Sequence, residues 1–514
     1  MASLEVEEKP SEVKQNTIWG ESKKMWAIAG PAILVSVSQF SIGFVTVAFA
    51  GHLGELELAA VTITTNVIEG FVFGIMLGMG SALETLCGQA VGAGQHNMLG
   101  IYLQRSWIIT GITALCLTPC YLLATPILNL LRQDKAISEL AGKYCKMVIP
   151  QFFAYAMNFP IQKFLQSQTK VWVMTIISII GLGCHVLLNW ALVTKLELGL
   201  LGAAMAGNIS WWLQVIAMVI YVVAGFFPDS WTGLSLLAFK SLWGFVKLSL
   251  ASAVMLCLEL WYFTAIILMV GYLKDPTLAV DSISICLNLQ LWTSMVTLGF
   301  NIAASVRVSN ELGAGRPKAA KFSIVVVVLT SLAVGVIFMA IILATKHDFP
   351  KLFTDKQLVI KAASKLGYFL AATIFLNSIL PVLHGVAVGA GWQAYVGLIN
   401  ITCYYLLGIP GGALLGFKFK LRVQGIWFGM LIGTVLQTTI LLFVMLRATW
   451  RKESRPTPRQ ANVLSLDSDK SSSDHKNLGF IEWVHLAVQA EERLRTWGGP
   501  TETPNISLES NSAG

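Results

Sequence analysis

Residues 307–317 read RVSNELGAGRP, a polar and glycine-rich stretch between two long apolar runs, where we expect a loop. Its Gly-Ala-Gly core at 313–315 recurs at 92–94, which is 221 positions earlier. A second match lies 223 positions apart, where Gln214 repeats as Gln437 within similar flanking residues. The two shifts nearly agree, so we interpret the chain as an internal duplication of one structural unit.

The composition indicates that most of the chain lies in a membrane. Hydrophobic residues make up 55% and charged residues 12% of the 514 residues, and the mean hydropathy is +0.67. A soluble domain carries about 25% charged residues, so the surface of this protein is expected to face lipid. The net charge of +8 does not indicate nucleic acid as a partner, because the basic residues form short clusters between apolar runs. The eight cysteines show no CxxC spacing and are interpreted as packing residues rather than metal ligands.

Twelve apolar runs are long enough to cross a bilayer, which takes about 20 residues per helix. Helices are predicted, because lipid offers no partner for an unpaired backbone group and the runs lack the alternation of barrel strands. The predicted spans are 25–50, 60–83, 105–126, 145–165, 171–194, 200–225, 244–272, 279–302, 321–345, 364–388, 393–416 and 424–447. Six spans separate the repeats, so both halves enter the membrane from the same side. The predicted fold is an all-α integral membrane protein with twelve transmembrane helices in two pseudo-symmetric six-helix lobes, which leave a cavity where they meet.

The same pattern predicts the domain organisation. A cytosolic tail at 1–24 precedes the N-lobe at 25–227, a linker at 228–243 and the C-lobe at 244–449. Residues 450–514 form a second cytosolic tail that is rich in Ser, Asp, Lys and Pro and is predicted to be largely disordered. Both termini are assigned to the cytosol because Lys and Arg are modestly enriched on that side.

Ionisable groups are rare inside the predicted spans, and each one is a functional candidate because it costs about 3 kcal/mol or more at the bilayer centre. Glu259 lies mid-span and is the first candidate to bind and release a proton, the alternative being a protonated carboxyl that only bonds a neighbouring helix. His384 is the second candidate, because histidine ordinarily changes charge near neutral pH. For His185 a packing role is favoured.

Uncharged polar groups and aromatic rings inside the spans are candidates to line a substrate cavity. Amides either bind a ligand or bond neighbouring helices to each other, and aromatic rings either stack on a flat organic molecule or pack. Glu69 in the second span is predicted to line the N-lobe side of the cavity. The candidates are Gln39, Asn66, Glu69, Tyr262, Asn288, Trp292 and Asn377.

The motifs of soluble enzymes and ATP-driven pumps are missing from the sequence. It contains no GxxxxGK[ST], HExxH or GxSxG motif, so no enzyme is predicted and an ion gradient is the expected energy source. No cofactor or metal is expected. A lipid or lipid-linked-precursor flippase is a rival, but it would need a strongly cationic cavity, and Lys163 is almost the only basic residue within the spans. An uncoupled organic-solute facilitator stays open as an alternative.

Four motifs resemble those of a known transporter family. They are LETLCGQA at 83–90, MLCLE at 255–259, RVSNELGAG at 307–315 and GAGWQ at 389–393. They resemble the multidrug and toxic compound extrusion (MATE) family, and within it the plant DETOXIFICATION branch. The resemblance implies a V-shaped, two-lobed antiporter that exports organic compounds, such as flavonoids, against a proton gradient. It also implies a monomer, with the vacuolar membrane favoured over the plasma membrane.

The resemblance also implies roles for single residues. The acidic residue that the family carries in its seventh helix corresponds to Glu259. Asn377 stands where many relatives have an aspartate, and Asn288 aligns with a glutamate of animal relatives. These departures leave Glu259 as the main carboxyl of the second lobe and make His384, where relatives carry Ser, a candidate for the missing titratable group. Na⁺ stays open as an alternative coupling ion. About 35 residues at 454–488 intervene between the last span and a short amphipathic stretch like the one with which relatives end, which indicates an insertion or a gene-model artefact.

Overall fold

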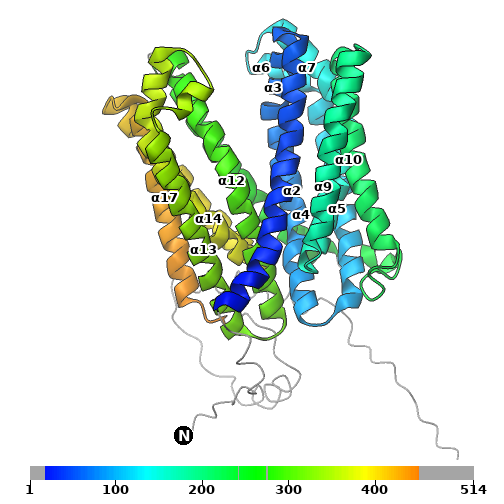
Figure 1. The fold of residues 1–514 in the computed structure, drawn as a ribbon. Coiled ribbons are helices and arrows are strands. Elements are labelled where there is room, and N and C mark those ends of the chain that lie inside the picture. The colour runs from blue at the N-terminus through cyan, green and yellow to red at the C-terminus, as the bar shows by residue number, and fades with distance from the viewer. Residues whose placement is uncertain (1–17, 241, 274–275, 451–514) are drawn as a thin grey trace, which may run out of the picture.

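The computed structural model describes residues 18–240, 242–273 and 276–450, and every regular element in these ranges is helical (Figure 1). The all-α prediction is therefore confirmed. The predicted cytosolic tail at 450–514, with its insertion, lies outside the described residues except for Trp450, and residues 1–17 lie outside them as well.

The helices of the first half are α2 (Ile18–Leu53), α3 (Glu55–Ile63), η1 (Thr64–Glu69), α4 (Gly70–Gly92), η2 (His96–Met98), α5 (Leu99–Leu122), α6 (Ala124–Leu130), α7 (Lys135–Met147), α8 (Ile149–Ser167), α9 (Val171–Asn189), η3 (Trp190–Lys195) and α10 (Gly199–Val223). The linker holds η4 (Leu236–Phe239). The helices of the second half are α11 (Leu242–Gly271), α12 (Pro276–Gly313), α13 (Pro317–Thr345), η5 (Phe349–Leu352), α14 (Gln357–Ala390), α15 (Gln393–Asn400), η6 (Ile401–Gly408), α16 (Ile409–Ala413), η7 (Leu414–Lys418) and α17 (Arg422–Arg447). Most of them extend beyond the predicted spans, because the polar flanking residues are helical too.

Ten helices among the described residues are long and apolar enough to cross a membrane, and the bent pair of α5 and α6 brings the number to eleven. The two members of that pair meet at 61°. The remaining predicted span corresponds to α8, whose polar side chains, such as Asn158 and Gln162, make its composition less typical of a span. α8 packs against α4, α5 and α10, so neighbouring helices cover much of its surface.

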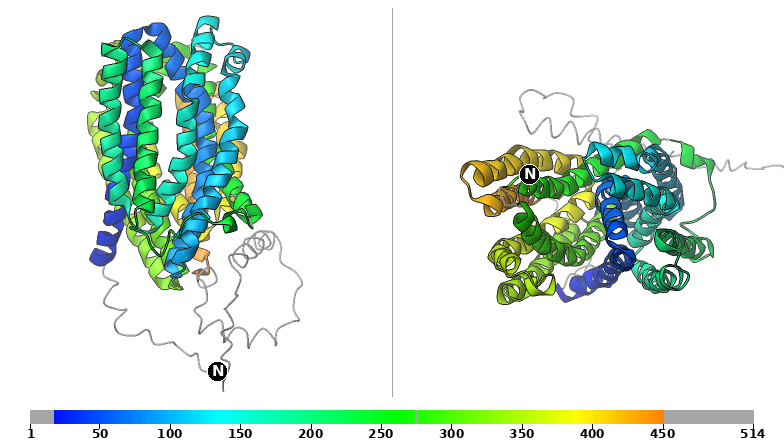
Figure 2. Two further views of the ribbon diagram at one scale, coloured as in Figure 1. Left: turned by 90° about the vertical axis from the view of Figure 1, so that its right-hand side faces the viewer. Right: turned by 90° about the horizontal axis from the view of Figure 1, so that it is seen from above.

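The helices form two bundles that converge at one end and diverge at the other (Figures 1 and 2). Helices α2 to α10 make up the N-lobe and helices α11 to α17 the C-lobe. The lobes converge where α2 begins and α17 ends, which we call the converging end, and they separate toward the opposite, diverging end (Figure 1).

Reciprocal glycine contacts show how the two halves are related in space. A Cβ on Gly92 of α4 would lie 2.0 Å from the carbonyl oxygen of Asn310, and a Cβ on Gly313 of α12 would lie 2.1 Å from that of Gln89. The two contacts are the same contact made twice, because each residue of one pair lies 221 positions from its counterpart in the other. This reciprocity is that of a pseudo-twofold axis between α4 and α12. We call this contact the lobe seam.

The sequence 307–317 is mostly helical, so the predicted loop was wrong over its first seven residues. α12 continues through Arg307 to Gly313, and only the next three residues turn. Arg307 and Glu311 lie one helical turn apart and form an ion pair of 2.6 Å, which stabilises the end of α12. Gly315 then adopts a φ of +70°, as Gly94 does after α4, and a left-handed glycine is a common way to end a helix.

The first helix of each lobe contributes to the cores of both lobes. Met25 near the start of α2 is buried among C-lobe residues, whereas Ile42 farther along is buried in the N-lobe. Phe245 near the start of α11 is buried among N-lobe residues, whereas Ile266 lies in the C-lobe core. The lobes are therefore interlocked at the converging end.

Candidate proton and substrate site

Aromatic contacts join the lobes in two places, between the start of α4 and α11 and between α2 and α12. The ring of Phe71 stacks on that of Trp261 with 5.4 Å between centroids, and Phe40 meets Trp292 edge to face at 4.9 Å. Phe71 and Trp261 are 40% and 39% exposed. The two rings thus combine one side packed on the other lobe with a surface that a flat apolar compound can reach.

Glu259 and His384 meet inside the C-lobe. The carboxylate Oε2 of Glu259, in the middle of α11, lies 3.2 Å from Nδ1 of His384 on α14. The Glu259 side chain is 20% exposed, whereas the His384 side chain is 3% exposed. The carboxylate can therefore exchange a proton with its surroundings, and the imidazole is in contact with it on the buried side.

A ring of hydrogen bonds continues from His384 and returns to α11. Nε2 of Gln437 on α17 lies 2.9 Å from Nε2 of His384, and the same amide nitrogen donates to Oδ1 of Asn400 on α15. Asn400 in turn donates to the backbone carbonyl of Met255 at 3.2 Å, one turn before Glu259 on α11. We call the four side chains of Glu259, His384, Asn400 and Gln437 the C-lobe ring.

The partners of His384 define which imidazole nitrogen carries the proton. The amide nitrogen of Gln437 is a donor, so Nε2 of His384 accepts. Nδ1 then carries the hydrogen and donates it to the Glu259 carboxylate. Oε1 of Gln437 is buried and has no hydrogen-bond partner, so this amide has an acceptor left over for a different arrangement of the ring.

Tyr262 does not lie where a substrate-cavity residue is expected. Its side chain is 1% exposed, its ring stacks on Tyr404 at 4.1 Å between centroids, and its hydroxyl donates to the carbonyl of Met430 at 3.3 Å. These contacts put Tyr262 in the C-lobe core. α11 buries the face that carries Tyr262 against Tyr404 of η6 and Met430 of α17.

The other C-lobe candidates lie on two helices. Asn288 is exposed and precedes the half-buried Trp292 by one turn, so both lie on one face of α12. Trp292 is also in edge contact with Phe44 of the N-lobe at 6.2 Å. Asn377 is half-buried and lies seven residues before His384, which corresponds to two turns along the same face of α14.

The N-lobe candidates lie on α2 and in η1. Gln39 is half-buried, and its side-chain nitrogen has no hydrogen-bond partner. Asn66 is exposed and Glu69 is half-buried, both in the π-helical segment η1. Three tyrosines of the N-lobe core, Tyr121, Tyr144 and Tyr155, lie close enough to Glu69 to interact with its charge. Glu69 is thus separate from the C-lobe ring.

Sequence reasoning missed parts of the site. Gln437 was noted only as part of the repeat and Asn400 was assigned no role, although uncharged amides inside apolar spans are the signal that could have drawn attention to them. Lys163 is not free, because its Nζ lies 2.6 Å from Glu84. His185 is fully buried and bonds Thr46 and Ser210, which agrees with the favoured packing role.

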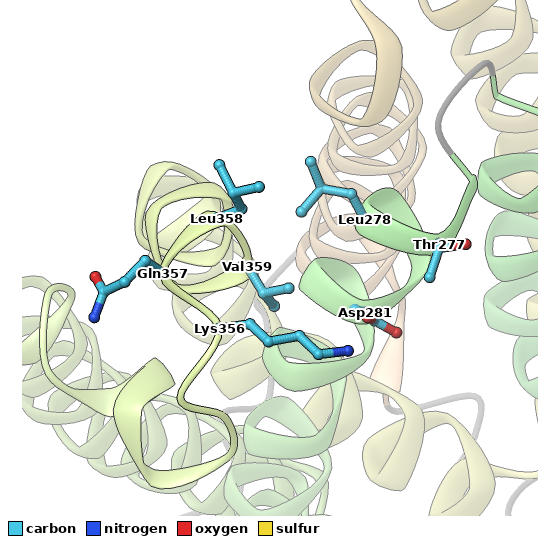
Figure 3. A pocket seen from close by; sticks show the side chains of 7 residues that line it. All are labelled: Thr277, Leu278, Asp281, Lys356, Gln357, Leu358 and Val359. Atoms are coloured by element: carbon cyan, nitrogen blue, oxygen red, sulfur yellow. The ribbon is translucent and has the colours of Figure 1, made fainter.

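A surface depression of about 450 Å³ lies elsewhere, between the starts of α12 and α14. Figure 3 shows Lys356 extended toward Asp281 across it, with Leu278 and Leu358 nearby. α12 and α14 begin at the diverging end, so this depression is not part of the C-lobe ring. Within the part of the chain that the structure describes, no group of three or more His, Cys, Asp or Glu side chains could hold a metal.

Comparisons with known proteins agree with the duplicated, two-lobed architecture. A family model described as MatE matches residues 31–191 and 251–414, one block in each lobe. Protein DETOXIFICATION 33 of Arabidopsis thaliana is 50% identical over 482 residues, which are 94% of this chain and 93% of that protein. Protein DETOXIFICATION 32 of Arabidopsis thaliana is 53% identical over 434 residues, 84% of each chain.

Solved structures show the same likeness. The crystal structure of the eukaryotic MATE transporter AtDTX14 has a TM-score of 0.81 at 32% identity, and the match covers 85% of this chain and 98% of that one. The Vibrio cholerae MATE transporter VcmN in the bent form has a TM-score of 0.73 at 18% identity, covering 85% and 98%, which is a likeness of fold alone.

Proposed function

Because the chain belongs to the MatE family of multidrug and toxic compound extrusion transporters, we propose that it is a proton-coupled antiporter that exports or sequesters organic compounds by alternating access. The chain is a multi-pass membrane transporter and not an enzyme. The observation that carries the proposal is the contact between the partly exposed Glu259 carboxylate and the buried His384 imidazole. A proton that binds to this pair changes the hydrogen bonds that the two side chains make.

Proton binding would change the C-lobe ring as a whole. While Glu259 is ionised, it accepts from Nδ1 of His384, and Gln437 and Asn400 complete the ring to the Met255 carbonyl. A proton on Glu259 weakens this charge-assisted contact. When the protonated carboxyl donates to Nδ1, the imidazole hydrogen sits on Nε2 instead, and the Gln437 amide can turn its unpartnered Oε1 to accept from Nε2. This turn withdraws the Gln437 amide nitrogen from Asn400. Both ends of the ring lie on α11, so the proton changes the contacts that hold this helix. A proton that binds two conformations unequally shifts the balance between them.

The proposed substrates are small organic compounds with a flat apolar part, such as xenobiotics or flavonoid-like secondary metabolites. Phe71 and Trp261 offer aromatic surface, and Gln39 and Asn377 offer half-buried amides. A lipid or lipid-linked-precursor flippase is less favoured, because the intramembrane Lys163 is already paired with Glu84.

Further expectations follow from the charge distribution and the resemblance. We propose that both termini face the cytosol and that the diverging end faces the vacuolar lumen, with the plasma membrane as the alternative location. Lys23, Lys24 and Lys321 lie at the converging end, which the positive-inside rule associates with the cytosol, although the diverging end carries basic residues too, such as Lys351 and Lys418. The transporter is expected to act as a monomer without a cofactor, with Na⁺ as the alternative to H⁺.

Transport in proteoliposomes tests the proposed coupling. The purified protein is reconstituted with an imposed pH gradient, and uptake of flavonoid glycosides, alkaloids and organic anions is measured together with proton flux. The wild type is expected to take up at least one compound with a matching proton flux, and Glu259→Gln to lose the gradient-driven part. Glu55→Gln, which alters an exposed glutamate at the diverging end, is the matched control. Full gradient-driven uptake in Glu259→Gln would refute the role of Glu259. Undiminished net flux after the gradient is collapsed would indicate an uncoupled facilitator, and dependence on Na⁺ alone would replace the proton.

A further inference from the structure

Charged side chains join the start of α2 to the C-lobe at the converging end. Arg307 donates from Nε to Oε1 of Glu21 at 2.7 Å and from Nη2 to Oε2 of Glu21 at 3.1 Å, and Nη2 also donates to Glu311 at 2.6 Å. The hydroxyl of Ser323 on α13 donates to Oε1 of Glu21 at 2.5 Å. Nε of Arg316 lies 2.8 Å from Oε2 of Glu311. We call these five residues the ion cluster.

The central members of the ion cluster are removed from solvent. The side chains of Glu21, Arg307 and Glu311 are 4%, 13% and 6% exposed. Separating Glu21 from Arg307 would leave Arg307 with Glu311 but the buried Glu21 carboxylate with only the exposed Lys24 at 4.0 Å, which is more costly than breaking an ion pair in water. The start of α2 is therefore held more firmly to the C-lobe than apolar contacts alone would hold it. Trp26 adds an edge contact with Phe300 of the C-lobe at 5.2 Å.

The duplicated half carries no counterpart of this cluster. At a shift of 221 positions, Glu21, Arg307, Glu311 and Ser323 correspond to Leu242, Leu86, Ala90 and Tyr102. All four of these counterparts belong to or pack against one apolar core cluster of the N-lobe. The two crossing helices are thus attached differently, α2 by charge and α11 by apolar side chains.

We propose that residues 18–30 of α2 move with the C-lobe, and not with the N-lobe, when the converging end opens. Just beyond this segment α2 is hydrogen-bonded to the N-lobe instead of the C-lobe, because Thr175 of α9 donates to the carbonyl of Pro31 at 3.0 Å. Pro31 has no N–H to bond the carbonyl of Ala27, so α2 has its weakest point where the two attachments meet. The inference rests on the alternating access proposed above but is independent of proton coupling.

Distances between spin labels in nanodiscs test this inference without any transport measurement. Labels are attached through Lys23→Cys on α2, Asn97→Cys on the N-lobe and Lys321→Cys on α13, which are exposed positions, in a background where the accessible Cys116, Cys120 and Cys184 are replaced by Ala. Pairs of labels are measured by double electron–electron resonance.

Opening is imposed by Gly313→Leu, because a side chain there would run into the Gln89 backbone at 2.1 Å. Gly111→Leu is the matched control, since a Cβ at Gly111 meets nothing within 4 Å. In Gly313→Leu the 97–321 and 23–97 distances are expected to lengthen, while the 23–321 distance keeps its wild-type distribution. Adding Glu21→Gln is expected to broaden the 23–321 distribution, and adding Glu55→Gln to leave it unchanged.

Two results would overturn the inference. A lengthened 23–321 distance with an unchanged 23–97 distance would show that the start of α2 stays with the N-lobe. A 23–321 distribution as narrow with Glu21→Gln as without it would show that the ion cluster does not hold the segment. A failure of pH-driven uptake alone would contradict only the proposed proton coupling.

Discussion

Replacing His384 with leucine removes the imidazole that contacts Glu259 and leaves the rest of α14 intact. The substitution deletes a hydrogen bond of 3.2 Å to an ionised carboxylate, in a site where the imidazole is 3% exposed. A hydrogen bond to a charged group contributes about 1.5–3 kcal/mol. One tenfold change in rate corresponds to about 1.4 kcal/mol. If the ring sets the barrier for the coupled step, His384→Leu should slow gradient-driven uptake by roughly 10- to 150-fold.

The assay is the initial rate of uptake in proteoliposomes, measured over a range of imposed pH gradients and normalised to the amount of folded protein. His384→Gln is the comparison, because its amide can still donate a hydrogen bond toward Glu259, and a smaller loss of about tenfold or less is expected. A merely structural role would lower the yield of folded protein and leave the rate per molecule and its pH dependence unchanged. Such a result, with wild-type rates in His384→Leu, would refute the reasoning.

Three further predictions concern stability and the core, each checked by thermal unfolding in detergent. Gly92→Val should lower the melting temperature, with a cost of about 1–3 kcal/mol or more, because its Cβ would lie 2.0 Å from the Asn310 carbonyl, whereas Gly111→Val should lower it by no more than the helix propensity of valine explains. Arg307→Met should cost about 3–5 kcal/mol, because it leaves the buried Glu21 carboxylate without the cation that lies 2.7 Å away; an unchanged melting temperature would mean that the ion cluster is solvated. Tyr262→Phe should cost about 1 kcal/mol and leave the uptake rate unchanged, because it removes only a hydrogen bond inside the core, and a large loss of uptake would place Tyr262 in the substrate path after all.

The duplication and the fold class could be predicted because each leaves a direct pattern in the sequence. Long apolar runs predict spans, and matches at 221 and 223 positions predict two like-oriented halves. The reciprocal contacts of Gly92 and Gly313 agree with that prediction in space. Helix ends were less predictable, since residues 307–313 look like a loop in composition but are held helical by the Arg307–Glu311 pair and its neighbours.

The candidate site was predictable residue by residue but not as an arrangement. Glu259 and His384 stand out because charged and titratable groups are rare in the spans. Their contact could not be predicted, because the two residues are 125 positions apart. A span that is apolar on all sides does not show which of its residues face the neighbouring helices. For the same reason Tyr262 was assigned to the cavity, although it stacks on Tyr404 in the core. The roles of the candidate residues stay predictions.

The reciprocal fit at the lobe seam has a consequence for the history of the chain. A contact in which Gly92 meets Asn310 and Gly313 meets Gln89 is what two identical subunits make across the dyad of an isologous homodimer. In such a dimer of unfused ancestors every charged pair would occur twice. Glu21 and Arg307 occur once, opposite Leu242 and Leu86. The acquisition or loss of these charges therefore followed gene fusion, which freed each half to diverge from its former twin.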